Sequence, residues 1–279
     1  MKNKVIRIIK ISILLIFLSL TACRQMTVLE SEYDNIPNPG YQIANDGFYD
    51  DATSLSEPVN LEIEPITNEF CGIADPDFAI ILNEVQALDY LALVNRCFRV
   101  SGDYVPSDLR VVNVDSVNVP ASGVHELRNS AASALEMLFD EANKSGLQLL
   151  LSSAYRSYDL QSFFHNLAIS NAGGDIEKAR RVSAIPGHSE HQLGLAADLT
   201  IRSLESVGWL SESFAETEEG KWVKENAHRF GFIISFPQGR ESDVAIIYEP
   251  WHIRFVGVEA ATEIFENQQI LEEYLWFKR

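Results

Sequence analysis

The stretch PGHSEHQLGLAADLTI, residues 186–201, decides the fold and contains the first candidate site residues. Its second half, residues 195–201, is mostly apolar and predicts a buried strand. His191 and Asp198 stand on either side of Gly194, a residue that tolerates the backbone angles of a tight turn. We therefore expect a turn at Gly194 that brings both side chains onto neighbouring backbone, with Asp198 at the start of the strand.

The sequence on either side of this strand predicts an α+β domain. In residues 125–145 apolar side chains recur at spacings of three and four, and Gly146 follows at a C-cap position, which predicts a helix. Further helices are expected over residues 159–168, 177–182, 220–229 and 258–276, and further strands over 147–152, 232–236, 246–248 and 251–256. Helices come mostly first and strands late, so we expect a compact single domain with helices around a central, mostly antiparallel sheet.

Composition limits the classes of function. The chain has 279 residues, and 46% of them are hydrophobic, which suffices for a sizeable core. Its formal net charge is −18. Because binding to nucleic acid requires clustered Lys and Arg against the phosphates, this balance argues against a nucleic-acid partner.

The N-terminal segment has the pattern of an export signal. Four basic residues lie within the first ten positions, and a short apolar run over residues 11–20 follows them. The sequence Leu20-Thr21-Ala22-Cys23 resembles a bacterial lipobox. The resemblance implies a signal peptide over 1–22, cleavage before Cys23 and acylation of that cysteine, which would anchor the domain outside the cytoplasm on the cell membrane. The alternatives are an ordinary secretory signal and an uncleaved anchor.

Residues 23–75 differ from the rest of the chain, because they combine four prolines, an acidic cluster and little periodicity. We interpret them as a flexible acidic stalk that follows the lipidated cysteine, with the globular domain over 76–279. Cys71 and Cys97 are the cysteines that remain. They form a disulfide or stay as two free thiols; the spacing does not decide between these, although export would permit the bond.

Two clusters of residues suggest a metal centre. A catalytic zinc ion takes three protein ligands and leaves one position open. His191 and Asp198 are candidate ligands, and His252 is a third candidate from a different strand. Glu249 lies three residues before His252, and Pro250 stiffens the link between them. We expect its carboxylate to face the attacking water as a general base.

Arg156, in the segment Ser153-Ala154-Tyr155-Arg156-Ser157-Tyr158, adds an anion-binding group. A guanidinium can bind a carboxylate through two parallel hydrogen bonds or stabilise an oxyanion. Zinc, a base and an arginine together suggest hydrolysis of an amide near a free carboxylate. Each cluster alone has a plainer interpretation: a chance His and Asp pair, a turn with a core tryptophan, or a surface arginine at the beginning of a helix.

Taken together, the clusters resemble the VanY-type D-alanyl-D-alanine carboxypeptidases, which are zinc metallopeptidases. The family pattern Ser-x-His-x-x-Gly-x-Ala-x-Asp matches residues 189–198, Glu-Pro-Trp-His matches 249–252, and Ser-x-Tyr-Arg-Ser matches 153–157. The segments Tyr104 to Leu109 and Trp222 to Gly231 also resemble the family, so the likeness runs from about residue 85 to the end.

The resemblance implies roles for individual residues. The implied zinc ligands are His191, Asp198 and His252. Glu249 is implied to take a proton from the attacking water and pass it to the leaving amine, and Arg156 to polarise the scissile carbonyl and stabilise the oxyanion. Ser189 and Gln161 are implied to line the substrate pocket together with Arg156, and His188 is a neighbouring loop residue that does not bind the metal.

The chain departs from the family pattern at two places. Ser235 stands where many relatives carry a basic residue, and residues 244–248 replace a stretch in which relatives often have a Thr-Gly pair. Neither change affects a proposed ligand or the base, so both bear on substrate preference. The implied substrate is a peptidoglycan stem peptide or precursor that ends in D-Ala-D-Ala, bound by a monomer. The alternatives are an L,D-carboxypeptidase or peptidoglycan endopeptidase with the same zinc chemistry, or an inactive cell-wall-binding module.

Overall fold

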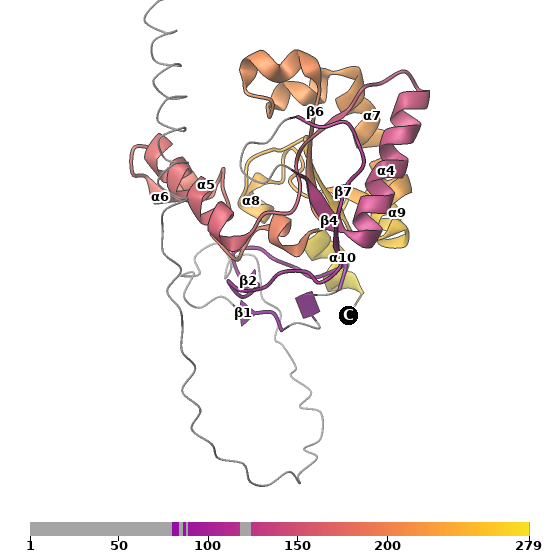
Figure 1. Cartoon of the computed structure of the whole chain (residues 1–279). Helices are drawn as coiled ribbons and strands as arrows, with labels where there is room; N and C mark the ends of the chain where they lie inside the picture. The colour runs from indigo at the N-terminus through magenta and orange to yellow at the C-terminus, as the bar shows by residue number, and fades with distance from the viewer. Residues whose placement is uncertain (1–79, 84–85, 88, 118–123, 279) are drawn as a thin grey trace, which may run out of the picture. The chain divides into compact units, whose positions relative to one another are not determined.

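A four-stranded antiparallel sheet forms the centre of the fold (Figure 1). Its strands, in spatial order, are β5 (Leu150–Ser153), β6 (Ala196–Thr200), β8 (His252–Phe255) and β7 (Phe232–Ile234). All five residues of β6 are buried, because this strand has a neighbour on each side and helices over the faces of the sheet. The apolar stretch after Gly194 therefore forms the buried strand that it predicts.

The computed structural model describes residues 80–83, 86–87, 89–117 and 124–278. The predicted signal peptide, Cys23, the stalk, Cys71 and the predicted domain boundary at residue 76 lie outside these residues. Within the described ranges, no helix combines the length and the apolar character that crossing a membrane requires. Cys97 is disulfide-bonded.

Helices surround the sheet. In the described part of the chain lie the α-helices α4 (Asn129–Lys144), α5 (Tyr158–Asn171), α6 (Ile176–Arg180), α7 (Glu218–Asn226), α8 (Glu241–Val244), α9 (Val258–Glu266) and α10 (Leu271–Phe277). The same part contains the 3-10 helices η2 (Glu190–Leu193), η3 (Arg202–Val207), η4 (Glu212–Glu216) and η5 (Ala227–Phe230). Two small pairs of strands precede the sheet: β1 (Ile80–Ile81) with β2 (Phe98–Arg99), and β3 (Leu109–Val111) with β4 (Glu126–Arg128).

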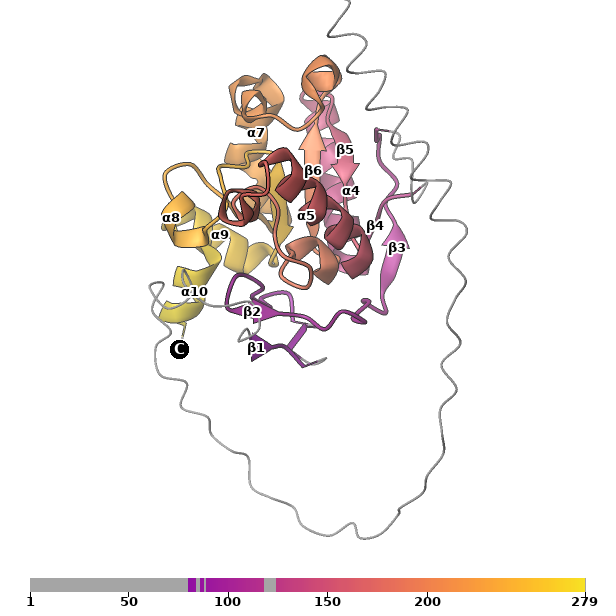
Figure 2. The same cartoon turned by 90° about the vertical axis from the view of Figure 1, so that its left-hand side faces the viewer.

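The helices pack against the sheet through their apolar faces. Figures 1 and 2 show α4 on one side of the sheet and α5 on the other. On α4 the residues at spacings of three and four are buried, and they join Leu151, Leu199 and Ile253 of the sheet in one hydrophobic core. Gly146 follows the helix with a φ of +80°, as its predicted C-cap position requires. The α+β architecture with a mostly antiparallel sheet is confirmed.

Two predicted elements differ from the structure. The helix predicted from His125 begins only at Asn129, because Glu126–Arg128 form β4 and pair with β3, a long-range contact that periodicity does not encode. The sequence predicts a strand over residues 246–248, but they form a loop after α8. Ala245 takes a left-handed φ of +61° there, and the amide of Ile247 donates a hydrogen bond to the carbonyl oxygen of Arg181 instead of joining the sheet.

The register of the sheet aligns candidate site residues. On β6, Asp198 lies opposite His252 of β8 on one side and opposite Ser153 of β5 on the other. Asp198 is thus the third residue of its strand, so its predicted place at the strand start is wrong. The strand begins two residues earlier because Ala196 and Ala197 already pair with β8.

Candidate metal centre

A turn at Gly194 places His191 beside the sheet. The residue takes a φ of +67°, which ends η2 and directs the chain into β6. A Cβ atom at this position would lie 2.8 Å from Leu109 Cδ2 and 3.0 Å from Arg128 Cγ. Both the left-handed backbone and the close contact therefore require glycine. The predicted turn is confirmed, and it brings His191 toward Asp198.

His191, Asp198 and His252 converge in the interior. One ligand atom from each lies within 4.8 Å of the others, and all three residues are buried. His191 Nε2 is 3.3 Å from Asp198 Oδ2, and His252 Nδ1 is 3.0 Å from Asp198 Oδ1. The structure thus brings together the three residues that the sequence suggested as ligands.

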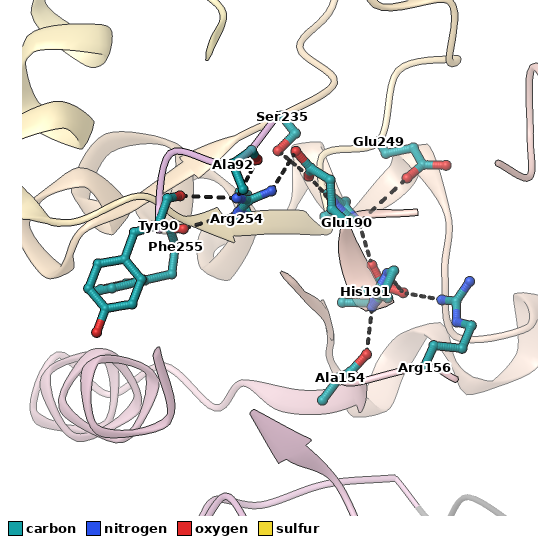
Figure 3. A network of polar contacts seen from close by, with 12 residues as sticks. Tyr90, Ala92, Ala154, Arg156, Glu190, His191, Ser235, Glu249, Arg254 and Phe255 are labelled. Atoms are coloured by element: carbon teal, nitrogen blue, oxygen red, sulfur yellow. Dashed lines mark hydrogen bonds and ion pairs between the residues drawn. The ribbon is translucent and has the colours of Figure 1, made fainter. Parts of the chain in front are cut away.

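Each histidine presents one ring nitrogen to the centre and has an oxygen at the other. His191 Nδ1 is 2.7 Å from the carbonyl oxygen of Ala154, to which it donates when Nε2 carries the lone pair (Figure 3). His252 Nε2 is 2.9 Å from the carboxylate of Glu190, so a proton on Nε2 is donated to that carboxylate while Nδ1 faces the other two ligands. Oxygen partners on the far nitrogen are the usual way in which proteins fix metal-binding imidazoles.

The electrostatics of the cluster also suit a cation. Burial lowers the pKa of His252, but hydrogen bonds to Asp198 and Glu190 and the charges of both carboxylates outweigh it and raise the pKa to about 10. Burial likewise opposes ionisation of Asp198, yet the histidines hold the pKa of this carboxyl well below its usual range. Positive charge is therefore favoured between the two carboxylates, and the donor set of two imidazoles and one carboxylate fits zinc.

Glu249 lies beside this cluster in a desolvated position. Its Oε2 is 3.9 Å from His252 Nδ1, and its side chain is 13% exposed. Burial raises the pKa of Glu249 to about 8, with Asp198 and Glu190 adding to the effect and His252 and Arg156 opposing it. A carboxyl with a pKa near neutrality can accept a proton and return it, as a general base must.

Arg156 borders the cluster from the β5 side. Its Nη1 donates to Gln161 Oε1 at 2.8 Å, and its Nη2 lies 3.3 Å from Ser153 Oγ and 3.5 Å from Asp198 Oδ2. The guanidinium also lies 5.1 Å from the centre of the Phe164 ring. Its Nε is buried and has no hydrogen-bond partner among the described residues.

The remaining predicted residues take different places. Gln161 is buried and holds Arg156, so it acts on the site through the arginine in this structure. Ser189 is buried at the start of η2, next to the ligand segment, and makes no capping hydrogen bond there. His188 points elsewhere: its Nδ1 is 2.7 Å from the carbonyl oxygen of Asn95.

Glu190 and Arg254 are site residues that sequence reasoning missed. Glu190 contacts His252, and Arg254 Nη1 donates to Glu190 Oε1 at 3.2 Å (Figure 3). Burial alone would raise the pKa of Glu190, but Arg254 and the hydrogen bonds from His252 and Ser235 lower it to about 2. One signal was available: Arg254 stands two residues after His252 in an apolar strand, hence on the same face, and a charge there needs a partner.

Comparison with known proteins agrees with this geometry. Residues 124–258 match the family model of VanY, D-alanyl-D-alanine carboxypeptidase. A putative carboxypeptidase of Bacillus subtilis (strain 168), YodJ, is 35% identical over 252 residues, which cover 86% of this chain and 91% of the relative.

Solved structures show the same likeness. The LdcB LD-carboxypeptidase is 40% identical with a TM-score of 0.64, over 72% of this chain and 92% of that one. The vancomycin resistance D,D-pentapeptidase VanY, solved with Zn(II), is 31% identical with a TM-score of 0.54, over 67% of this chain and 98% of that one. The resemblance inferred from the three motifs is thereby confirmed, and the chain belongs to the VanY family of D-alanyl-D-alanine carboxypeptidases.

Proposed function

We propose that this protein is a zinc-dependent carboxypeptidase that removes the terminal D-alanine from peptidoglycan stem peptides or precursors ending in D-Ala-D-Ala. The observation that carries the proposal is the convergence of three buried ligands on one point, with Glu249 and Arg156 beside it. The ligands would be His191 through Nε2, Asp198 through its carboxylate and His252 through Nδ1. When bound, zinc supplies Lewis-acid chemistry that polarises a carbonyl and makes water a usable nucleophile near neutral pH.

Glu249 moves the proton in this mechanism. Its carboxylate takes a proton from the attacking water and afterwards gives it to the amine that leaves, which is free D-alanine. Burial keeps the pKa of Glu249 near neutrality, so the proton is neither held too tightly nor too weakly. The carboxylate lies beside the proposed ligands, with Oε2 3.9 Å from His252 Nδ1.

Arg156 binds the charge that develops on the substrate. Ser153, Gln161 and Asp198 hold its terminal nitrogens, so the guanidinium is already oriented before substrate arrives. A guanidinium N–H that these contacts leave free can then donate to the scissile carbonyl oxygen as that oxygen becomes negative. Ser189, buried beside the ligand segment, is the residue that we place next to the bound peptide.

An L,D-carboxypeptidase is the second candidate. The 40% identical LdcB structure, of which this chain covers 92%, is named for that reaction. The zinc chemistry is the same in both cases, because the ligands and the base act on the amide whichever residue precedes it. The two candidates differ in the substrate: an L,D enzyme cleaves a stem that ends in one D-alanine after an L-centre, and a D,D enzyme cleaves the D-Ala-D-Ala bond.

The experiment that tests the function uses the full-length, zinc-loaded protein and two stem peptides. One pentapeptide ends in D-Ala-D-Ala, and one tetrapeptide ends in a single D-alanine. Released D-alanine is measured with and without a chelator. Release from the pentapeptide that stops with chelator supports the proposal, and release from the tetrapeptide alone supports the L,D alternative. If D-alanine is released from neither peptide, both carboxypeptidase candidates are contradicted, and an inactive cell-wall-binding module is favoured.

We propose further that acylated Cys23 holds the domain on the outer face of the cell membrane. The proposal is supported by the basic, apolar and Leu-Thr-Ala-Cys order of the first 23 residues. Replacing the acceptor, Cys23→Ser, should move the protein from the detergent-rich to the aqueous phase in a detergent partition of bacterial cells. Equal partition of the two forms would contradict the lipid anchor.

A further inference from the structure

Glu190 is a buried carboxylate that faces a zinc ligand from the side opposite the metal position. Its residue is 7% exposed, and both of its oxygens are engaged. Oε2 accepts from the Ser235 hydroxyl at 2.7 Å and lies 2.9 Å from His252 Nε2. Oε1 accepts from Arg254 at 3.2 Å. An ionised carboxylate in the interior is costly unless it is paired and hydrogen-bonded, and here both conditions hold.

Arg254 connects this carboxylate to the segment that precedes β2. Its side chain is completely buried. Besides Glu190, it donates through Nη2 to the carbonyl oxygens of Tyr90 and Ala92, both at 3.0 Å, and through Nε to Phe255 (Figure 3). These contacts fix the guanidinium in one orientation. The guanidinium in turn fixes Glu190, which cannot rotate away from His252 without leaving a buried positive charge unpaired.

We propose that Glu190 is a positioning residue for the metal centre: by accepting the Nε2–H of His252, it selects the tautomer whose Nδ1 lone pair faces Asp198 and His191. The inference rests on the zinc site of the proposed function and concerns ring orientation and tautomer, not a contact with the substrate. Its physical basis is that a carboxylate on the far nitrogen of a metal-binding imidazole fixes the ring and increases its basicity. His191 has only a backbone carbonyl in that place, so the two histidines differ in how they are held.

The residues around Glu190 direct its negative charge toward His252. Ser235 donates a neutral hydrogen bond to Glu190. Within the described residues, Arg254 is therefore the one cation that forms an ion pair with Glu190, apart from His252 itself. The negative charge of Glu190 is balanced from one side by Arg254 and is directed at His252 on the other.

Glu190→Gln tests the proposal. Arg254 requires an acceptor, so the amide oxygen of glutamine should turn toward Arg254 and its NH2 group toward His252. A donor facing Nε2 favours the other tautomer, in which Nδ1 carries the proton. The zinc dissociation constant, measured by competition with a chromogenic chelator on full-length protein, should then rise about 10- to 100-fold.

Glu136→Gln on α4 is the matched control. Glu136 also accepts two hydrogen bonds from an arginine, Arg110, at 2.7 and 2.8 Å, and within the described residues it contacts none of the three ligands. This variant should weaken an ion pair but leave the zinc dissociation constant within threefold of wild type. If Glu190→Gln folds and its constant also stays within threefold, the proposed role is wrong and Glu190 only stabilises the fold.

A second measurement does not depend on the folding of any variant. In the zinc-loaded wild-type protein, nitrogen NMR of the histidine rings should show His252 with zinc on Nδ1 and a proton on Nε2, and His191 with zinc on Nε2 and a proton on Nδ1. Coordination of His252 through Nε2 would overturn the proposal. Neither measurement needs turnover, so a negative result for the role of Glu190 can be told apart from a failure of the protein to release D-alanine.

Discussion

The substitution Glu249→Gln should have opposite effects on activity and on stability. Glutamine keeps the shape of the side chain but can neither accept the proton from water nor carry a charge. With zinc bound, loss of a general base should lower kcat about 10²- to 10⁴-fold. Zinc affinity should be retained, because Glu249 is not among the ligands. Released D-alanine measures the first effect, and chelator competition measures the second.

The stability effect follows from the pKa of Glu249. The ordinary value is 4.5, and burial raises the pKa to about 8 in the folded protein. The folded state therefore keeps a proton that the unfolded chain has already lost, so stability present below pH 4.5 is lost as the pH rises toward 8. The interval from 4.5 to about 8 corresponds to about 5 kcal/mol at most.

Glutamine removes this penalty because it does not ionise. In metal-free protein the variant should match wild type at pH 4 and exceed it at pH 9 by a few kcal/mol. For a domain of this size, that difference raises Tm by on the order of 10 °C. Thermal unfolding in chelator at both pH values measures it, with the exposed Glu259→Gln on α9 as the control that should leave Tm unchanged at both. Equal Tm values for Glu249→Gln and wild type at pH 9, or activity within tenfold of wild type, would refute the reasoning.

Three further predictions concern the arginine, the turn and the metal. Arg156→Lys should lower kcat/KM about 10²- to 10³-fold, because a lysine ammonium cannot keep the contacts to Ser153 and Gln161 and also donate to the substrate. The control Arg202→Lys changes an exposed arginine and should leave kcat/KM unchanged. An unchanged kcat/KM in Arg156→Lys would contradict the assigned role. Gly194→Ala should reduce the free energy of unfolding by about 1–3 kcal/mol in urea titrations, because both the φ of +67° and the nearby Leu109 side chain disfavour a Cβ atom. A urea midpoint equal to that of wild type would argue against the turn. Zinc at about a thousand times its Kd should stabilise the protein by about 4 kcal/mol, and His191→Ala should abolish this gain; a gain that persists in the variant would place the metal elsewhere.

Two of the three ligands could be predicted from the sequence because they are close along the chain. His191 and Asp198 share one short segment, and Gly194 between them indicates the turn that joins them. The position of Asp198 in β6 was less accurate, because strand ends depend on pairing with β8. The same limit explains residues 126–128, which pair with β3, a partner that helical periodicity does not reveal.

The support of the ligands could not be predicted in this way. Glu190 is next to His191 in the sequence, yet it serves His252, which lies 62 residues later. Arg254 is two residues from His252, yet half of its hydrogen bonds go to Tyr90 and Ala92. Ligands are recognisable because zinc requires a small set of residue types, whereas a supporting carboxylate or arginine resembles any surface charge until the fold buries it.

The arrangement also links the chemistry of the site to the fold. Asp198 receives contacts from His191, His252 and Arg156, so one carboxylate on the central strand orients both histidines and the guanidinium. β6 has hydrogen-bonded partners on both sides, β5 and β8. His252 stands on the neighbouring strand, where Glu190 and Arg254 brace it from behind. The three ligands would thus hold a metal from η2, β6 and β8, and the buried pair of Glu190 and Arg254 supports the ligand on β8. Loss of this pair should loosen His252, while Asp198 stays on β6 and His191 keeps its contact with the Ala154 carbonyl oxygen.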